Sequence, residues 1–115
     1  MRIEGEVHGL DTADRAARAT VYVRIQDVSR ADAASTTLAE VRLDDVAVPA
    51  GEPLAVPFAL DVDESMLDAR ASYILAVHVD VTGSGDVTQG DYLTTQSVPV
   101  PPPGTRVDIP VRAVS

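Results

Sequence analysis

The 115-residue sequence contains no cysteine, lysine, asparagine or tryptophan. Without cysteine the chain cannot form a disulfide, a thiolate metal site or a cysteine nucleophile, so it needs no oxidising compartment in order to fold. The nine basic residues are all arginines, and they face 18 acidic residues to give a net charge of −9. The arginines are scattered singly, whereas nucleic acid or anionic lipid requires a clustered basic face. We therefore expect no nucleic-acid partner, and we expect the negative charge to favour a monomer.

Long apolar stretches are also missing. No run approaches the ~20 apolar residues of a membrane-spanning helix. The first residues, Met1-Arg2-Ile3-Glu4-Gly5, include no apolar core of a signal peptide, and the chain has no cysteine for a lipobox. The length suits a single domain, residues 1–115, which would bury roughly 65% of the surface exposed by the unfolded chain.

Apolar side chains recur at every second residue, and a helical period of 3.6 is nearly absent. The segments with this alternation are residues 2–9, 19–28, 36–43, 54–60, 73–81, 91–97 and 106–114. We predict an all-β fold: one antiparallel β-sandwich, immunoglobulin-like or transthyretin-like, with about seven to eight strands. Its core would include Val23, Phe58, Leu75, Val77 and Ile109.

Two segments lack this alternation. Residues 10–18 are polar and alanine-rich without an apolar stripe, which favours a loop. Residues 61–69 are the best place for the one short helical turn that we expect. Asp63 or Ser65 would cap this turn, and Met66 and Leu67 would pack inward.

The two histidines are the residues most suited to metal chemistry. His8 shares a predicted strand face with Glu4 and Glu6, and His78 shares one with Asp80. Residues i and i+2 of a strand project side by side, so each group offers only part of a ligand set. A stable zinc site needs three or four ligands, which would require two such strands to be neighbours. The simpler interpretation is that both groups lie on solvated outer faces.

No motif for catalysis or cofactor binding is complete. The segment that begins at Asp61 resembles a calcium-binding EF-hand loop, but Met66 and Ser72 stand where the loop needs glycine and glutamate. A nucleophile elbow and a phosphate-binding loop are both missing. We therefore predict no enzyme, no cofactor and no metal. A metal-dependent or hydrolytic enzyme is an alternative that would require His8 and His78 to lie close together beside a carboxylate.

The densest polar segment is Asp27-Val28-Ser29-Arg30-Ala31-Asp32-Ala33, which follows the alternating strand 21–26. The chain must turn there, because small and charged residues replace the apolar alternation. Ser29 and Asp32 can bond to their own backbone, and Arg30 can pair with a carboxylate. We predict an ion-paired corner between two strands.

The order of the motifs resembles the YbaY/YscW family of type III secretion lipoprotein chaperones, or pilotin-like proteins. The specific elements are Asp-Val-Ser-Arg-Ala-Asp-Ala at residues 27–33 and Val-Pro-Phe at residues 56–58. The weaker ones are Glu4-Gly5-Glu6-Val7, Leu38-Ala39-Glu40, residues 73–80, Thr94-Thr95 and Val98-Pro99-Val100. After residue 80 the chain departs from the family pattern, because residues 81–93 replace the usual Gly-x-Leu-x-Phe segment.

The resemblance implies a small β-sandwich of the cell envelope that is tethered through a lipidated N-terminal cysteine. The type III members are similar to pilotins, which escort a secretin subunit to the outer membrane. The resemblance brings no catalytic residue. The family-motif positions that it marks, with an expected structural role, are Asp27, Ser29, Arg30, Asp32 and Tyr73. Because the sequence contains no lipobox cysteine, the cytoplasm is the alternative location.

We predict a non-enzymatic, chaperone-like module that grips a peptide or protein segment at a strand edge or in a cleft between sheets. Proline at positions 57, 99 and 101–103 would protect some strand edges from pairing, so the partner is expected at an edge without proline. The alternative is a structural β-sandwich with no dedicated ligand. A continuous apolar patch on the otherwise acidic surface would favour binding.

Overall fold

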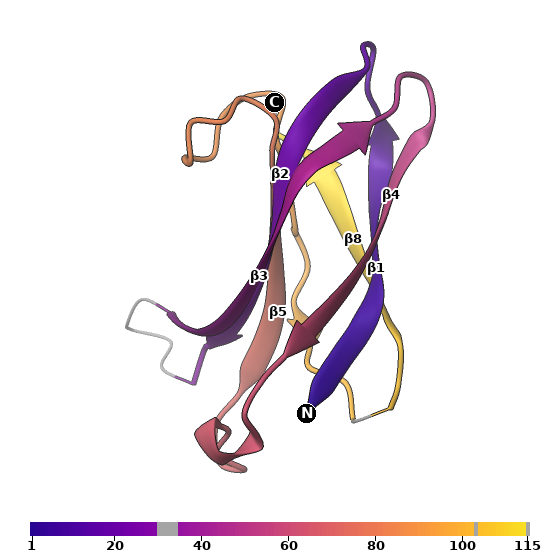
Figure 1. Ribbon diagram of the computed structural model, residues 1–115. Coiled ribbons are helices and arrows are strands. Elements are labelled where there is room, and N and C mark those ends of the chain that lie inside the picture. Colours follow the sequence, from indigo (N-terminus) through magenta and orange to yellow (C-terminus); the bar gives the residue numbers. More distant parts are fainter. Residues whose placement is uncertain (30–34, 103, 115) are drawn as a thin grey trace.

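The computed structural model describes residues 1–29, 35–102 and 104–114 (Figure 1). The strands are β1 (Arg2–Thr12), β2 (Ala17–Asp27), β3 (Thr36–Val48), β4 (Pro53–Asp61), β5 (Tyr73–Asp80), β6 (Tyr92–Leu93), β7 (Val98–Pro99) and β8 (Val107–Ala113), and η1 (Glu64–Met66) is a 3₁₀ turn. The predicted all-β class with one short helical turn is confirmed. Within the described residues, no helix has the length and apolar character needed to span a membrane.

The strands form one strongly curved sheet in the order β3-β2-β5-β6-β8-β1-β4, and β7 pairs with β5 beside this path. Strands β2, β3 and β5 form one side of the molecule, and β1, β4 and β8 form the other (Figure 1). The two sides are joined through β6, so the sandwich is nearly closed, like a barrel. The strands at the two ends of this path are β3 and β4, and no ladder joins them in the described chain.

One strand pair differs from the antiparallel pattern that the sequence predicts. The first and last strands, β1 and β8, run parallel, with Gly5 opposite Val107 and Gly9 opposite Val111. The remaining ladders between named strands are antiparallel. Parallel pairing is possible here because the whole chain lies between the two strands and supplies the long crossover that such pairs require.

The core lies between the two sides and consists almost entirely of aliphatic side chains. The predicted core residues Val23, Phe58, Leu75, Val77 and Ile109 are all buried in one cluster. Burying each such side chain contributes about 1.5–3 kcal/mol relative to leaving it exposed. The two-residue alternation therefore identifies the inward faces correctly.

Two local predictions are wrong. The loop predicted for residues 10–18 is mostly strand, because Thr12 pairs with Pro53 and Ala17 with Val48, and ladder bonds do not need apolar side chains. The 3₁₀ turn forms as expected, and the carboxylate of Asp63 accepts a hydrogen bond from the backbone N–H of Ser65. However, Met66 is 52% exposed. A turn of three residues cannot direct both Met66 and Leu67 inward, and Leu67 packs on the core.

We predict that Gly5→Ala destabilises the fold by about 1–3 kcal/mol, the usual cost of overpacking. A Cβ atom at Gly5 would lie 1.8 Å from the carbonyl oxygen of Val107, and this contact is between backbones that the parallel ladder holds in place. Urea-induced unfolding measures the change in free energy.

Gly9→Ala on the same strand is the matched control, because its Cβ would approach no described atom closer than 3.2 Å. It should cost less than Gly5→Ala. Equal stabilities for wild type and Gly5→Ala would contradict the close approach of β1 and β8.

Candidate functional site

The two edge strands differ in how well they are protected from pairing. Strand β4 carries Pro53 and Pro57, and proline has no N–H to donate to a ladder. Strand β3 contains no proline over its 13 residues. The two strands draw apart with distance from the turn that joins them (Figure 1). The edge without proline, at which we expect a partner, is therefore β3.

The inward row of β3 is apolar but incompletely covered. It consists of Ala39, Val41 and Leu43, which lie opposite Ile25, Val23 and Val21 of β2. The three β2 residues are 0% exposed, whereas the β3 residues are half-buried. Strand β2 has a neighbour on each side and β3 has only one, so the apolar interior reaches the surface along the β3 edge.

Irregular pairing limits this edge to a short regular segment. The β2–β3 register shifts once near Leu38 and again at Asp44 and Asp45. Asp45 has a φ of 53°, a conformation that residues other than glycine adopt only occasionally. Bulges and charged residues protect edges against unspecific pairing. Residues 39–43, between the two irregularities, are the regularly paired part of this edge strand.

The outward face of β3 is charged. Glu40 pairs with Arg24, and Arg42 pairs with Asp44. Both guanidinium groups lie over the ring of Tyr22, at 4.9 Å for Arg24 and 6.0 Å for Arg42. This cluster keeps the outer face polar while the inner row stays aliphatic, which is the alternation of a strand with one wet face.

The predicted corner after β2 is built from hydrogen bonds. The carboxylate of Asp27 accepts bonds from the N–H and the hydroxyl of Ser29. The Ser29 hydroxyl oxygen accepts a bond of 2.8 Å from the N–H of Ser72, and the Val28 N–H donates to the Ser72 carbonyl. Tyr73 pairs with Asp27 in the β2–β5 ladder. The corner therefore ties the end of β2 to the start of β5.

Arg30 and Asp32, the other predicted members of the corner, lie outside the described residues. The status of Asp27, Ser29, Arg30, Asp32 and Tyr73 as family-motif residues stays a prediction.

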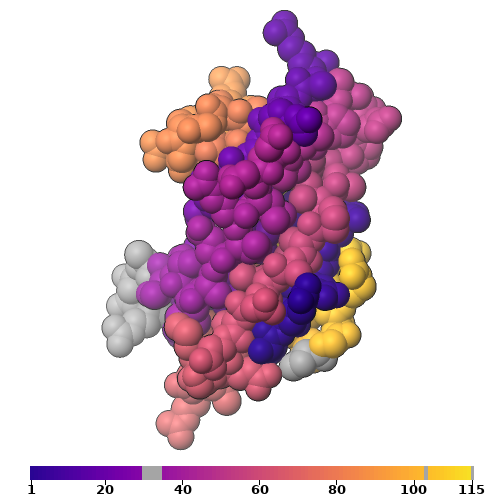
Figure 2. Space-filling view, viewed as in Figure 1, coloured from indigo at the N-terminus to yellow at the C-terminus, as the bar shows by residue number. Residues whose placement is uncertain are grey.

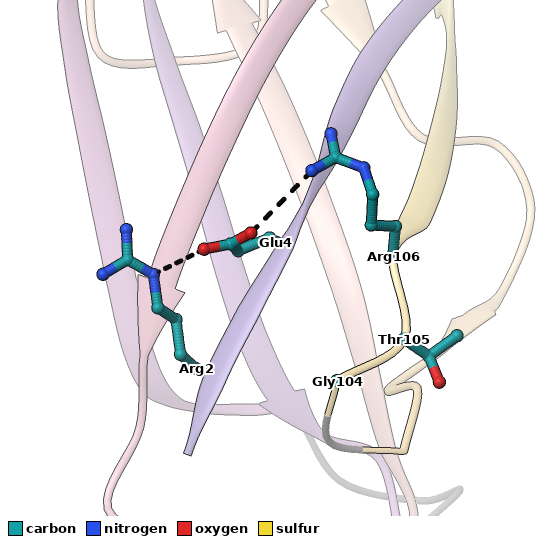
Figure 3. A pocket seen from close by; sticks show the side chains of 5 residues that line it. All are labelled: Arg2, Glu4, Gly104, Thr105 and Arg106. Atoms are coloured by element: carbon teal, nitrogen blue, oxygen red, sulfur yellow. Dashed lines mark ion pairs between the residues drawn. The ribbon is translucent and has the colours of Figure 1, made fainter.

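Two shallow hollows lie near the chain start. One, of about 450 Å³, is lined mainly by apolar residues that include Leu67, Tyr73 and Val100. The other, of about 370 Å³, is drawn in Figure 3 and is lined by Arg2, Glu4, Gly104, Thr105 and Arg106. There the carboxylate of Glu4 lies 2.8 Å from Arg2 and 3.8 Å from Arg106. These groups are exposed and paired with each other, so the second hollow offers no set of catalytic groups.

The predicted solvated face around His78 is wrong. His78, Asp80 and Asp91 are 5%, 2% and 0% exposed. The residues after β5 return along its outer face and bring Asp91 against His78, with 2.8 Å between Nε2 and Oδ2. The ring of Tyr22 stacks on the imidazole, with 5.9 Å between the ring centres.

The three groups are also the ones in the described chain that could hold a metal, since one ligand atom from each lies within 4.8 Å of the others. This set does not include His8, which lies on β1 opposite Ala55. The pairing of His8 with His78 that the alternative of a metal-dependent or hydrolytic enzyme would require is therefore not part of the described structure. Sequence reasoning found His78 and Asp80 but missed Asp91.

The Asp91 carboxylate is held in its charged form. Burial raises the pKa of this carboxyl group, but hydrogen bonds from His78 and from the N–H groups of Val81 and Thr88 outweigh it, so the pKa lies below its ordinary value. The unfolded state therefore binds a proton more readily than the folded state. Asp91 stabilises the fold above the ordinary carboxyl pKa, and this contribution is lost as pH falls through the lowered pKa.

We predict that Asp91→Asn lowers the free energy of unfolding at neutral pH by about 1–3 kcal/mol, because buried donors lose their charged acceptor. It should also make the free energy of unfolding depend less on pH below about pH 5. Urea unfolding at a series of pH values measures both effects. Asp86→Asn, an exposed position in the same loop, is the control. A profile of Asp91→Asn that is parallel to that of wild type would contradict this account.

Comparisons with known proteins agree with this geometry. The family model of the type III secretion system lipoprotein chaperone YscW matches residues 1–111. A solved structure, an alternative pilotin from the type II secretion system of Vibrio cholerae, superposes with a TM-score of 0.71 at 24% sequence identity. That alignment covers 100% of this chain and 97% of the pilotin, and at this identity it shows a shared fold.

The comparison with curated protein sequences gives no match. The family match covers nearly the whole chain, from Met1 just before β1 to Val111 within β8. With its all-β architecture and the motif order described above, the chain belongs to the YscW family of type III secretion system lipoprotein chaperones.

Proposed function

We propose that this protein is a non-enzymatic, pilotin-like chaperone of the cell envelope, which binds an extended segment of a secretin subunit along the edge of β3. The family match supports the chaperone class. The observation that carries the position of the site is the half-buried row of Ala39, Val41 and Leu43 beside fully buried partners on β2.

A strand added at this edge would give β3 a second neighbouring strand. Its backbone would pair with β3, and its inward side chains would cover the aliphatic row. Addition of a strand is a common mode of peptide recognition, in which backbone hydrogen bonds provide affinity and alternate side chains provide specificity. Each such bond contributes about 0.5–1.5 kcal/mol net. The regular stretch 39–43 fits a short segment of about five residues.

The charge of the protein indicates which residue types the bound segment contains. The protein carries a net charge of −9, and this overall charge acts on the bound segment, since Asp44 and Asp45 beside the regular stretch of β3 are paired with Arg42 and Arg18. A basic segment would be attracted and an acidic one repelled. We therefore infer a segment that alternates aliphatic residues with arginine or lysine.

The side chains with catalytic potential support a non-enzymatic role. Glu4 lies in ion pairs with arginines at an exposed hollow. The buried His78 is bonded to Asp91, whose oxygens also accept backbone N–H groups. The ion pairs of Glu4 and the hydrogen bonds of His78 and Asp91 are therefore structural contacts. The apolar edge of β3 is the better candidate for recognition.

We predict that Val41→Lys weakens binding of the secretin segment at least tenfold, because it places a cation in the aliphatic row and opposes a basic partner. Overlapping peptides that span the secretin of the source organism serve as probes in fluorescence anisotropy. Hydrogen exchange should show protection of residues 39–43 on binding. Lysine can extend its charged end to solvent at this half-buried position, so the variant should fold.

Ala55→Lys is the matched control, because Ala55 is exposed on the other edge strand, β4. It should bind like wild type. If no secretin peptide binds, or if binding protects residues elsewhere and is unaffected by Val41→Lys, the proposal fails and the purely structural alternative gains support.

A further inference from the structure

The regular stretch of β3 is complementary to itself in the antiparallel direction. It reads Ala-Glu-Val-Arg-Leu over residues 39–43, and Val41 is its middle residue. The irregularities that bound the stretch begin at Leu38 and Asp44, which stand three residues before and three residues after Val41. A second copy of the strand, turned by a two-fold axis at Val41, would therefore match the first copy residue for residue.

The charged side chains support this position of the axis. In such a pair, Glu40 of each copy lies opposite Arg42 of the other copy, and opposite charges directly across antiparallel strands are favourable. An axis at Glu40 or at Arg42 would place that residue opposite itself, and like charges in this position are unfavourable. An axis between two residues would set inward side chains opposite outward ones. Charge and alternation thus both select Val41 as the centre.

The two charged residues have room for a second partner. Within one copy, Glu40 is paired with Arg24, and Arg42 is paired with Asp44. The side chains of Glu40 and Arg42 are still 39% and 59% exposed. A carboxylate accepts several hydrogen bonds and a guanidinium group donates up to five, so each group can keep its partner and gain another. Glu40 would then lie between Arg24 of its own copy and Arg42 of the other.

The inward side chains also match across the axis. Val41 would face Val41 of the other copy, and the small Ala39 would face the larger Leu43. These three residues are half-buried, although their partners on β2 are fully buried. Self-pairing would cover the aliphatic row of each copy with the row of the other, and removal of apolar surface from water favours association.

The position of β3 allows another molecule to approach. Within the described residues, β3 forms a ladder with β2 and with no other named strand. In the space-filling view, the purple-to-magenta atoms of this segment lie on the near surface of the molecule (Figure 2). Residues 39–43 include no proline, so each one carries a backbone N–H group. Those N–H and carbonyl groups that point away from β2 can pair with a second strand.

We propose that two copies of this protein associate through β3, antiparallel about Val41, so that their sheets continue into one another. The paired stretch is short, and the interface is expected to bury less than the ~1,200 Å² of stable complexes. We therefore expect a weak dimer, with a Kd on the order of 10⁻⁴ M. The net charge of −9 on each copy opposes association, so the protein is expected to be a monomer at low concentration.

The dimer would cover the same edge that the proposed function assigns to the secretin segment. The two bound states would exclude each other, and binding of a secretin segment would separate the dimer. Until then, self-pairing would protect the edge from unspecific pairing. This competition rests on the proposed function, whereas the dimer itself does not.

The test of the dimer is sedimentation equilibrium of the protein alone, from about 10 µM to about 1 mM. Sodium chloride at about 0.15 M limits the repulsion between the two acidic copies. We expect the mean mass to rise from monomer towards dimer, and the NMR amide signals of residues 39–43 to shift over the same range. A monomer throughout, or shifts confined to other strands, would overturn this proposal. Neither result would contradict secretin binding, which the peptide titration measures separately.

Charge variants test the position of the axis. Glu40→Arg and Arg42→Glu each place like charges across the axis twice, so each variant alone should dimerise about tenfold more weakly or worse. The two changes shift the net charge in opposite directions, so net charge cannot explain weakening of both. In an equimolar mixture the variants present opposite charges to each other, and their association should return to within about threefold of wild type.

Glu52→Arg is the matched control, because it changes charge by the same amount at an exposed turn position outside β3. It should dimerise at least as tightly as wild type. Glu40 and Arg42 are also exposed, so both variants should fold. If either variant alone dimerises like wild type, or if the mixture fails to associate, the antiparallel pairing about Val41 is wrong.

Discussion

The structure depends on covering a core of small aliphatic side chains from both sides with one curved sheet. The chain has a single phenylalanine and no tryptophan, so the interior is filled by many valine, isoleucine and leucine residues rather than by a few large rings. An interior filled by these smaller side chains requires the strands around it to lie close together. The contact of Gly5 with the backbone of Val107 shows how tightly the first and last strands meet. The sheet then closes almost completely, and in the described residues no ladder joins β3 to β4.

The two strands on either side of the opening, β3 and β4, are protected from pairing in different ways. Strand β4 is protected by prolines, while β3 is protected only by bulges at the ends of its regular stretch. The side chains of Val41 and Leu43 point inward and pack on the core, but each remains partly exposed at the surface. A row of this kind is both a weakness in the fold and a surface suited to an added strand. The proposed function uses this row as its recognition surface.

A buried polar cluster lies on the outer face of the layer that β2, β3 and β5 form. The loop after β5 folds back so that Asp91 reaches His78, and Tyr22 covers the imidazole. This placement buries two carboxylates outside the hydrophobic core, where backbone N–H groups and hydroxyls surround them. The loop and β3 are connected through Tyr22, whose ring stacks on His78 and also lies beneath the guanidinium group of Arg42.

Much of the fold followed from local pattern. The alternation of Val21, Val23 and Ile25 predicted an inward face, and the polar run after Asp27 predicted a turn. Ser29 was expected to bond to its own backbone in this turn, and its hydroxyl oxygen instead accepts the N–H of Ser72, 43 residues away. The burial of His78 was missed, because a strand pattern cannot show that a loop returns over its outer face.

The sequence by itself determined the class of fold, the inward side chains and the family, since these depend on the two-residue period and on short local motifs. Only the tertiary structure decided which edge stays open, that β1 and β8 run parallel, and that Asp91 meets His78 and Asp80. The physical reason is that pairing between distant strands depends on how all the aliphatic faces are covered at once. No local pattern carries that information.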